Sequence, residues 1–394
     1  MRLKLKHLAQ NLALALASLL AVLALLEFVV FGLILKPDDA LSITTINSVV
    51  RYEPMREATF RHPDGRQSLV TINRDGWNSS KPRYELEKPA GRLRVAVIGD
   101  SYVHASYVDT RQAFPEVIER HLAAQGIDAE VLRFGVDGAP LSQYLHVLRT
   151  EVADYKPDVV LVQLIHNDFD ESHRFLKTRY GSSFMKVGID EQGRLHDIPP
   201  VDYEPSLADL LRTSATFRYL YYETNLYLRL RSLVSRYVWG GEEDYDPANI
   251  VSGVDVRHLD DAQTMARVTG YVLDEMKSLS ERNGFRLALS IDAVRETIYG
   301  RKDAATARVE ALNAMAATAA KSARLPLLDL TATFKADYET HKARFEYPYD
   351  WHWNERANEL VGVALADWII SDPRLLGVRP GAANAPQTRP APRG

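Results

Sequence analysis

The sequence contains no cysteine, which excludes disulfide bonds, thiolate metal ligands and a cysteine nucleophile in one step. It also lacks an excess of charge, because 48 lysine and arginine residues stand against 52 aspartate and glutamate residues, a formal net charge of −4. A nucleic-acid-binding chain needs a basic face, so this balance argues against a nucleic-acid partner. The 394 residues are enough for one large domain with additions.

Only one long stretch of the sequence lacks charge, and it lies at the N-terminus. No charged residue occurs from Leu12 to Leu26, and the apolar run continues from Phe28 to Leu35 after a single Glu27. A helix needs about 20 apolar residues to cross a bilayer, so this run is long enough. Glu27 is costly at mid-bilayer, and it is tolerable near the outer interface or paired with another helix.

The flanking residues of this run predict its orientation. Arg2, Lys4 and Lys6 precede it and are expected to stay in the cytoplasm, which places the rest of the chain outside. The run exceeds the ~7–15 apolar residues of a cleaved signal peptide, and no small-x-small site follows it. We therefore predict an uncleaved signal anchor over residues 1–36, in a single-pass protein of the inner (cytoplasmic) membrane with its main domain on the periplasmic side.

Strand and helix patterns alternate from residue 92 onward, after a polar and partly β lead-in over residues 37–91. This alternation predicts an α/β fold, in which helices cover a parallel sheet. The predicted strands are 94–98, 130–134, 158–165, 286–291 and 325–330, and the predicted helices are 113–124, 141–153, 262–282, 304–323 and 355–370.

Two further segments stand apart from this alternation. An insertion over residues 169–258 contains a stretch, 217–239, that is dense in tyrosine, leucine and arginine. We interpret it as a helical cap packed on the sheet, with a lid or a membrane-facing helix as the alternative. The tail over residues 371–394, rich in proline and alanine towards its end, is predicted to be disordered.

Polar or conformationally special residues follow four of the five predicted strands. They are Gly99-Asp100-Ser101 after the first, Gly135 to Gly138 after the second, His166-Asn167-Asp168 after the third, and Asp350 and His352 beyond the fifth. Parallel strands place their carboxyl ends at one edge of the sheet, which is where ligands bind in open α/β sheets. We therefore expect these residues to converge.

This set suits acyl transfer through a serine. The Ser101 hydroxyl is a weak nucleophile that needs a base within hydrogen-bond reach, and His352 can be that base. Asp350 can hold the imidazole in the correct tautomer and stabilise its charged form. Two or three donors must hold the oxyanion of the tetrahedral intermediate, and the backbone N–H groups of Ser101 and Gly138 and the amide of Asn167 are candidates.

Each of these residues also has a structural interpretation. Ser101 and Asn167 could be helix caps, Gly138 a turn glycine and His352 a packed loop histidine. A tight group of metal-binding residue types is also present, namely His166, Asp168 and Asp170. No ligand from another segment is evident for it, so we predict no metal.

Together the motifs resemble the SGNH, or GDSL, hydrolase superfamily over residues 92–370. The four residues that name the superfamily correspond to Ser101, Gly138, Asn167 and His352, and Asp350 completes the triad. Residues 71–78 resemble the lead-in of membrane-anchored bacterial members. The Asp-x-His spacing replaces the common Asp-x-x-His and resembles the alginate O-acetyltransferase type of envelope domain, and Ile165 stands where the family often has glycine.

The resemblance implies a flavodoxin-like three-layer α/β/α sandwich with five parallel strands, and catalysis without a metal or organic cofactor. Three functions stay open. The first is an esterase that removes acyl groups from an acylated saccharide of the envelope or from a small ester, with acetyl as the first candidate for the acyl group. The second is an O-acyltransferase that modifies an envelope polysaccharide. The third is a non-catalytic glycan-binding scaffold, against which an intact Ser101, Asn167 and His352 argue. We predict the esterase.

Overall fold

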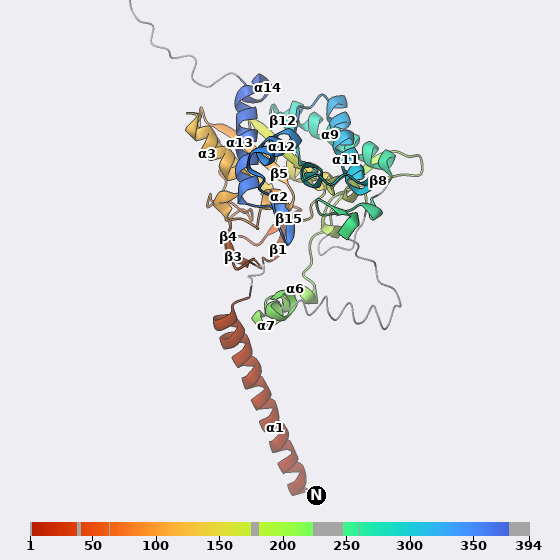
Figure 1. The fold of residues 1–394 in the computed structure, drawn as a ribbon. Helices are drawn as coiled ribbons and strands as arrows, with labels where there is room; N and C mark the ends of the chain where they lie inside the picture. Colours follow the sequence, from red (N-terminus) through yellow and green to blue (C-terminus); the bar gives the residue numbers. More distant parts are fainter. Residues whose placement is uncertain are drawn as a thin grey trace, which may run out of the picture. The chain divides into compact units, whose positions relative to one another are not determined.

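The computed structural model describes residues 2–37, 41–62, 64–174, 181–223, 247–259 and 261–377. The chain divides into two units. Figure 1 labels the helices and strands of both. The first unit comprises Met1–Ser42, Ala58–Ser68 and Glu204–Tyr245, and the second comprises Ile43–Glu57, Leu69–Tyr203 and Asp246–Gly394. Each unit is considered by itself.

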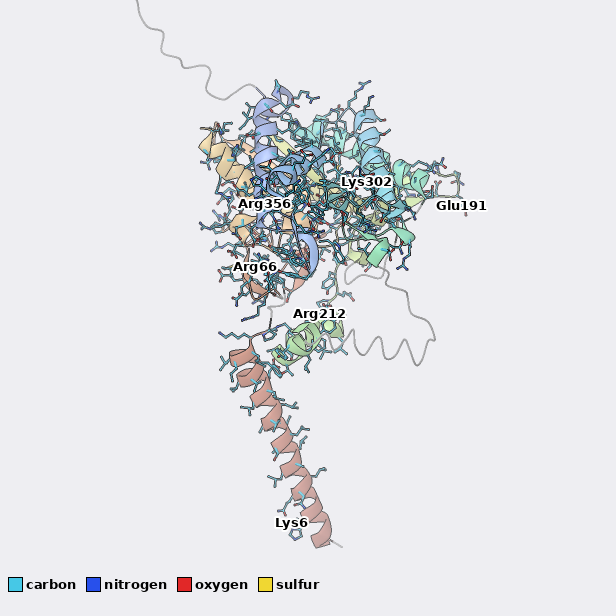
Figure 2. The ribbon with its side chains drawn as sticks, in the orientation of Figure 1. Lys6, Arg66, Glu191, Arg212, Lys302 and Arg356 are labelled. Carbon is cyan, nitrogen blue, oxygen red and sulfur yellow. The ribbon has the colours of Figure 1, made fainter. Side chains whose placement is uncertain are left out.

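The first unit is built around the N-terminal helix. Helix α1 (Arg2–Ala24) continues as a π-helical segment, η1 (Leu25–Leu35), and Lys6 lies at its N-terminal end (Figure 2). Within the described residues, one helix is long and apolar enough to cross a membrane, over Gln10–Leu35. The predicted apolar helix is therefore present. The same unit contains the short helices α6 (Leu207–Leu211) and α7 (Ala215–Arg218).

A five-stranded sheet forms the centre of the second unit, in the order β13–β12–β7–β5–β6. All of its strand pairs are parallel. Counted along the chain, this order is 2-1-3-4-5, the flavodoxin-like arrangement. The strands are β5 (Leu93–Gly99), β6 (Ala129–Gly135), β7 (Val159–Leu164), β12 (Arg286–Ile291) and β13 (Leu327–Asp329).

Helices cover both faces of this sheet. Because successive side chains of a strand point to opposite faces, Val95 and Val97 join one core with Phe114 of α3 and Val361 of α13. Three helices line that face: α3 (Phe114–Ala124), α12 (Thr331–His341) and α13 (Glu355–Ser371). The other layer consists of α4 (Leu141–Thr150), α9 (Ala262–Asn283) and α11 (Ala304–Ser322). The predicted three-layer α/β/α sandwich is confirmed.

The sequence prediction missed α12. Phe334 is the only buried residue of this helix, so its sequence lacks the apolar repeat that reveals a helix. The lead-in to the sandwich contains four short strands: β1 (Ile43–Ile46), β2 (Val49–Tyr52), β3 (Arg56–Arg61) and β4 (Gln67–Ile72).

The insertion over residues 169–258 was predicted to be helical, and the structure shows strands in it as well as short helices. Strands β8 (Lys186–Ile189) and β9 (Leu195–Ile198) form an antiparallel hairpin, whose turn contains Gly193 at φ 75°. Strands β10 (Ile250–Val251) and β11 (Val254–Asp255) form a second hairpin. Both turns use a glycine with positive φ, which favours a hairpin over a continuous helix. Of the stretch 217–239, residues 224–239 lie outside the described residues.

The predicted disorder of the tail is wrong at its start. Asp372 caps a further short helix, α14 (Pro373–Leu376), through its side chain, and Leu375 is buried in the main core. Apolar burial therefore orders the chain up to residue 377. Residues 378–394, which include the part rich in proline and alanine, lie outside the described residues.

Gly135 allows the closest approach in this sandwich, between the end of β6 and the short helix α2 (Ser101–His104). A Cβ atom at Gly135 would lie 2.3 Å from the His104 nitrogen, 2.7 Å from the Val103 carbonyl carbon and 2.9 Å from the Asp100 oxygen. All three are backbone atoms, so no side chain can move aside. This position therefore requires glycine if α2 is to stay where it is.

We expect Gly135→Ala to lower the free energy of unfolding by about 1–3 kcal/mol, because overpacking forces the backbone of α2 to shift. Gly270→Ala is the matched control, since it lies inside α9 with nothing within 4 Å of the added Cβ. It is expected to stabilise the chain by about 0.5–1 kcal/mol through helix propensity. Denaturant unfolding of the full chain in detergent measures both, and equal effects would contradict the packing argument.

Candidate active site

Ser101 lies at the carboxyl end of β5, between the ends of β6 and β7. The strand order reverses here, and this switch point is where flavodoxin-like sheets bind ligands. Asp100 is the N-cap residue of α2, and its Oδ1 accepts the Tyr102 N–H at 2.9 Å. The capping role considered for Ser101 therefore belongs to Asp100, and the Ser101 hydroxyl does not cap the helix.

The structure brings His352 and Asp350 to this serine. The Nε2 atom of His352 lies 2.8 Å from the Ser101 Oγ, and its Nδ1 lies 2.5 Å from Asp350 Oδ1. A carboxylate can only accept, so Nδ1–H donates to Asp350 and Nε2 is left to accept the Ser101 hydroxyl proton. This is the arrangement that a serine nucleophile requires of its base.

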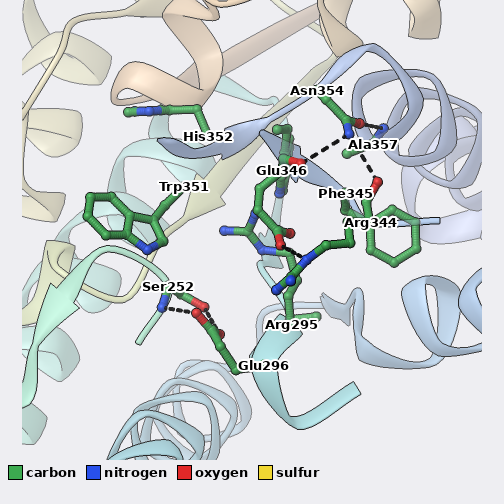
Figure 3. Close-up of polar contacts among 12 residues, drawn as sticks. Ser252, Arg295, Glu296, Arg344, Phe345, Glu346, Trp351, His352, Asn354 and Ala357 are labelled. Atoms are coloured by element: carbon green, nitrogen blue, oxygen red, sulfur yellow. Dashed lines mark hydrogen bonds and ion pairs between the residues drawn. The ribbon is translucent and has the colours of Figure 1, made fainter. Parts of the chain in front are cut away.

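Local strand geometry explains why the unusual Asp-x-His spacing works. Both residues lie in β15 (Asp350–Trp353), where alternate side chains share a face. Asp350 and His352 therefore lie on one face, and Figure 3 shows Trp351 leaving the strand on the other side. Asp350 Oδ1 also accepts the backbone N–H of His352 at 2.7 Å, which fixes the carboxylate against the ring that it supports.

Aromatic rings and a buried arginine hold β15 against α2. The Tyr107 ring stacks on His352 with centroids 4.6 Å apart and an interplanar angle of 11°. The Tyr102 hydroxyl donates to the Trp351 carbonyl at 2.9 Å and accepts from Arg295 Nη2 at 2.9 Å. These contacts fix the imidazole relative to the helix that carries Ser101.

The charges around the imidazole favour its protonated form. Burial alone would lower the pKa of His352, but the hydrogen bond and the charge of Asp350 raise it above its usual value, and Asp100 and Asp137 add to the rise. Burial likewise opposes ionisation of Asp350, yet His352 and the Tyr107 hydroxyl bring its pKa below the usual range. The carboxylate thus stays anionic beside a histidine that readily holds a proton.

The two predicted oxyanion donors outside α2 lie on the loops that flank Ser101. Gly138 follows β6 at φ 70°, in a turn that favours glycine, with nothing within 4 Å of where a Cβ would lie. Asn167 precedes the short helix α5 (Asp168–Glu171), but its side chain makes no capping hydrogen bond. Its amide donates to Glu171 Oε1 at 3.5 Å, the outer limit for such a bond. The amide can therefore change partner at little cost.

The residues considered as metal ligands have other partners. Asp168 is buried, and it accepts the Tyr144 hydroxyl at 2.7 Å and the Ile165 N–H at 2.8 Å. Burial raises its pKa well above the usual range. His166 Nε2 lies 2.9 Å from Asn313 Oδ1, and Asp170 pairs with Arg174 at 2.6 Å. These contacts shape the loop after β7.

A supporting cluster beside Gly138 was missed by the sequence prediction. The Nδ1 atom of the buried His104 lies 2.7 Å from Asp137 Oδ1 and 2.9 Å from the Tyr52 hydroxyl. The rings of His104 and Tyr52 stack with their centroids 4.2 Å apart. Tyr52 comes from β2, so the lead-in supports the loop that carries Gly138. Asp137 lies within the motif from Gly135 to Gly138. No sequence signal connects it to His104 and Tyr52, which are 33 and 85 positions away.

Residues 95–201 match the family model described as GDSL-like Lipase/Acylhydrolase. The matched region contains Ser101, Gly138 and Asn167, and it ends before Asp350 and His352. The match confirms the predicted resemblance to the GDSL hydrolases, and with it the prediction of a carboxylic ester hydrolase of this type. No curated protein matches the chain.

Several solved structures have a low similarity to this chain. The acetyl xylan esterase AlAXEase is 12% identical with a TM-score of 0.38, covering 71% of this chain and 100% of its own. TesA is 15% identical with a TM-score of 0.39, covering 72% and 100%. A lipase/acylhydrolase from Enterococcus faecalis is 14% identical with a TM-score of 0.38, covering 70% and 95%. With TM-scores below 0.5, these similarities do not indicate the substrate of this chain.

We expect Asp350→Asn to move the acid limb of the kcat/KM profile to lower pH and to reduce kcat by about 10³–10⁴. His352 must be neutral to accept a proton, so wild-type activity is lost as pH falls through its raised pKa. Removing the anion that raises this pKa moves that limb down. The matched control is Asp367→Asn, which disrupts an exposed Asp–His pair with His121. An acid limb that does not move in Asp350→Asn would contradict this assignment.

Asn167→Ala is expected to lower kcat by about 10²–10³ with little change in KM, because an oxyanion donor acts in the transition state. Its side chain caps no helix, so the unfolding midpoint should stay at the wild-type value. Steady-state kinetics with a chromogenic ester measures both constants. A raised KM with unchanged kcat would assign Asn167 to ground-state binding instead.

Proposed function

We propose that this chain is a serine-dependent ester hydrolase that removes acyl groups, in the first place acetyl, outside the cytoplasm. The observation that carries the proposal is the hydrogen-bonded series Ser101 Oγ, His352 Nε2, His352 Nδ1 and Asp350 Oδ1, with steps of 2.8 and 2.5 Å. It lies at the carboxyl edge of the sheet, and its serine is within the residues that match the GDSL acylhydrolases.

The proposed reaction has two balanced halves. The Ser101 hydroxyl proton passes to His352 Nε2 while Oγ attacks the ester carbonyl, and His352 then gives that proton to the leaving alcohol. A water molecule attacks the acyl-serine in the same way, which releases the carboxylic acid and restores Ser101. Asp350 stabilises the imidazolium that forms in each half. None of these steps uses a cofactor.

The oxyanion of each tetrahedral intermediate is assigned to three donors: the backbone N–H groups of Ser101 and Gly138 and the Asn167 amide. Support comes from the sheet order, since β6 and β7 are the neighbours of β5 and adjacent strands lie about 4.8 Å apart. The register pairs Gly99 with Gly135 of β6 and Ile98 with Val162 of β7, so the loops of Gly138 and Asn167 start beside that of Ser101. Preorganised donors of this kind are the largest single catalytic contribution in many acyl-transfer enzymes.

The substrate class follows from the location. We assign residues 92–370 to the hydrolase domain and the N-terminal helix to an uncleaved anchor in the inner membrane, with the domain on the periplasmic side. The apolar span Gln10–Leu35 and the basic residues that precede it support this topology. Acylated saccharides of the envelope and small esters are the substrates within reach of such an enzyme.

The test is turnover of p-nitrophenyl acetate by the full chain in detergent, with Ser101→Ala and His352→Ala beside the wild type. We expect both variants to lose at least about 10³ in kcat while their unfolding midpoints match the wild type. The matched control is Ser322→Ala, an exposed serine near the end of α11. An unchanged rate in Ser101→Ala would refute the site assignment.

The same experiment separates the remaining functions. Adding a saccharide acceptor and measuring acetyl sugar against free acetate distinguishes an O-acyltransferase from a hydrolase, because the acyl-serine is common to both. A wild-type chain that turns over no ester and acylates no acceptor would instead indicate a glycan-binding scaffold.

A further inference from the structure

Glu27 is the one charged residue between Leu12 and Leu35, and its carboxylate is fully engaged within the first unit. It accepts the Ser214 hydroxyl at 2.8 Å and the backbone N–H groups of Ala215 and Thr216 at 2.7 and 3.0 Å. Ser214 is itself the N-cap of α7, since its Oγ accepts the Phe217 N–H at 3.1 Å. The carboxylate therefore completes a helix cap that is 187 residues away in sequence.

The position of Glu27 along the span determines the depth of this contact. Leu35, where the apolar span ends, lies eight positions after Glu27. At the helical rise of about 1.5 Å per residue, the contact lies up to about 12 Å inside the end of the span. The hydrocarbon core of a bilayer is about 30 Å thick, so this depth falls within the outer leaflet. A second contact repeats the pairing one turn later, where the Phe31 and Tyr219 rings are 4.8 Å apart.

Several polar groups of residues 204–223, the segment that contains α6 and α7, bond to one another. Asp209 pairs with Arg212 at 2.8 Å, and their side chains are 9% and 16% exposed. Arg218 Nη1 donates to the carbonyl oxygens of Arg212 and Thr213 at 3.1 and 3.0 Å. Figure 2 shows Arg212 among the short helices of this unit. Charges that are satisfied by partners within the same segment are what a low-dielectric surrounding demands.

The leucines of the segment point outward instead. Leu207 and Leu210 are 73% and 65% exposed, and Leu211 and Leu220 are also exposed. Phe28 and Ile34 of the anchor are exposed as well, each 70%. A surface that faces water exposes its charges and buries its leucines, whereas residues 204–223 expose leucines and pair charges with one another. The anchor exposes apolar side chains in the same way.

We propose that residues 204–223 form a second membrane-embedded element, with the lipid of the outer leaflet as its partner, joined to the anchor through Glu27 and the Ser214 cap. The proposal rests on the membrane anchor proposed above. It gives the Glu27 carboxylate hydrogen-bond partners at its depth in the bilayer, from the start of α7. It also requires that the N-terminal helix stay attached, because cleavage would remove the carboxylate that completes the cap. The segment then lies along the anchor within the leaflet instead of projecting into water.

The absence of cysteine makes this proposal directly testable. Single variants Leu33→Cys, Leu210→Cys and Leu86→Cys of the full chain each carry one unique label site, and all three positions are exposed. A fluorescent label is attached to each, the chain is placed in phospholipid nanodiscs, and quenching by lipid-bound nitroxide and by aqueous iodide is compared. We expect lipid quenching at positions 33 and 210 and iodide quenching at position 86.

The outcomes separate the inference from the anchor on which it rests. A label at 210 that is quenched by iodide overturns the inference while position 33 still reports an inserted anchor. A label at 210 that neither quencher reaches means that protein covers the segment, which also overturns it. If position 33 is not quenched by lipid, the anchor is wrong and the inference fails with it.

The role of Glu27 is tested by Glu27→Leu, which favours insertion of the anchor but removes the acceptor of the cap. We expect lipid quenching at position 33 to persist and quenching at position 210 to fall by at least half. Glu27→Gln keeps one acceptor oxygen and is expected to lie between that variant and the wild type. Unchanged quenching at 210 in Glu27→Leu would refute the coupling through Glu27.

Discussion

The hydrogen bond between Ser101 and His352 joins two parts of the chain that are 251 residues apart, and the surrounding structure serves to hold its ends in place. One end depends on the close approach of α2 to β6, where only glycine at position 135 leaves room for the backbone. The other end depends on a four-residue strand held by aromatic stacking and by the Tyr102 hydroxyl. A small displacement of either end would separate the nucleophile from its base.

Buried charge couples these two ends. Arg295 is buried, donates to the Tyr102 hydroxyl, and lies 3.3 Å from Asp292. It also lies 3.4 Å from Glu346, which is drawn beside it in Figure 3. Asp292 in turn accepts the Trp353 indole N–H at 3.1 Å. Burial raises the pKa of Asp292 to about 6, although Arg295 and Trp353 lower it. The loss of one member would leave its partners uncompensated, which is strongly destabilising for a buried charge.

Three anionic groups near the imidazole have different parts in the proposed chemistry. Asp350 contacts the ring directly, whereas Asp100 caps the helix that carries Ser101 and Asp137 holds the loop of Gly138 through His104. Burial raises the pKa of Asp100 to about 6, against the effects of Tyr102 and His352. Protonation of His352 is thus stabilised by residues whose first function is to position the backbone. The same device recurs in the first unit, where the Glu27 carboxylate completes a helix cap.

Local patterns in the sequence determined the strands, most of the helices and the residues at the strand ends, because short apolar runs and turn residues act over a few positions. The motifs and their resemblance suggested His352 as the base for Ser101 and a flavodoxin-like sheet. The distance between the two side chains and the supporting pair of His104 and Tyr52 depend on contacts between distant segments, and only the tertiary structure decided them. Helix α12 and the β8–β9 hairpin escaped prediction for a related reason, since few of their residues enter the main core. Glu27 is the clearest example. From the sequence alone we inferred that this charge within an apolar run needs a partner, and only the folded chain shows that Ser214, the N-cap of α7, is that partner.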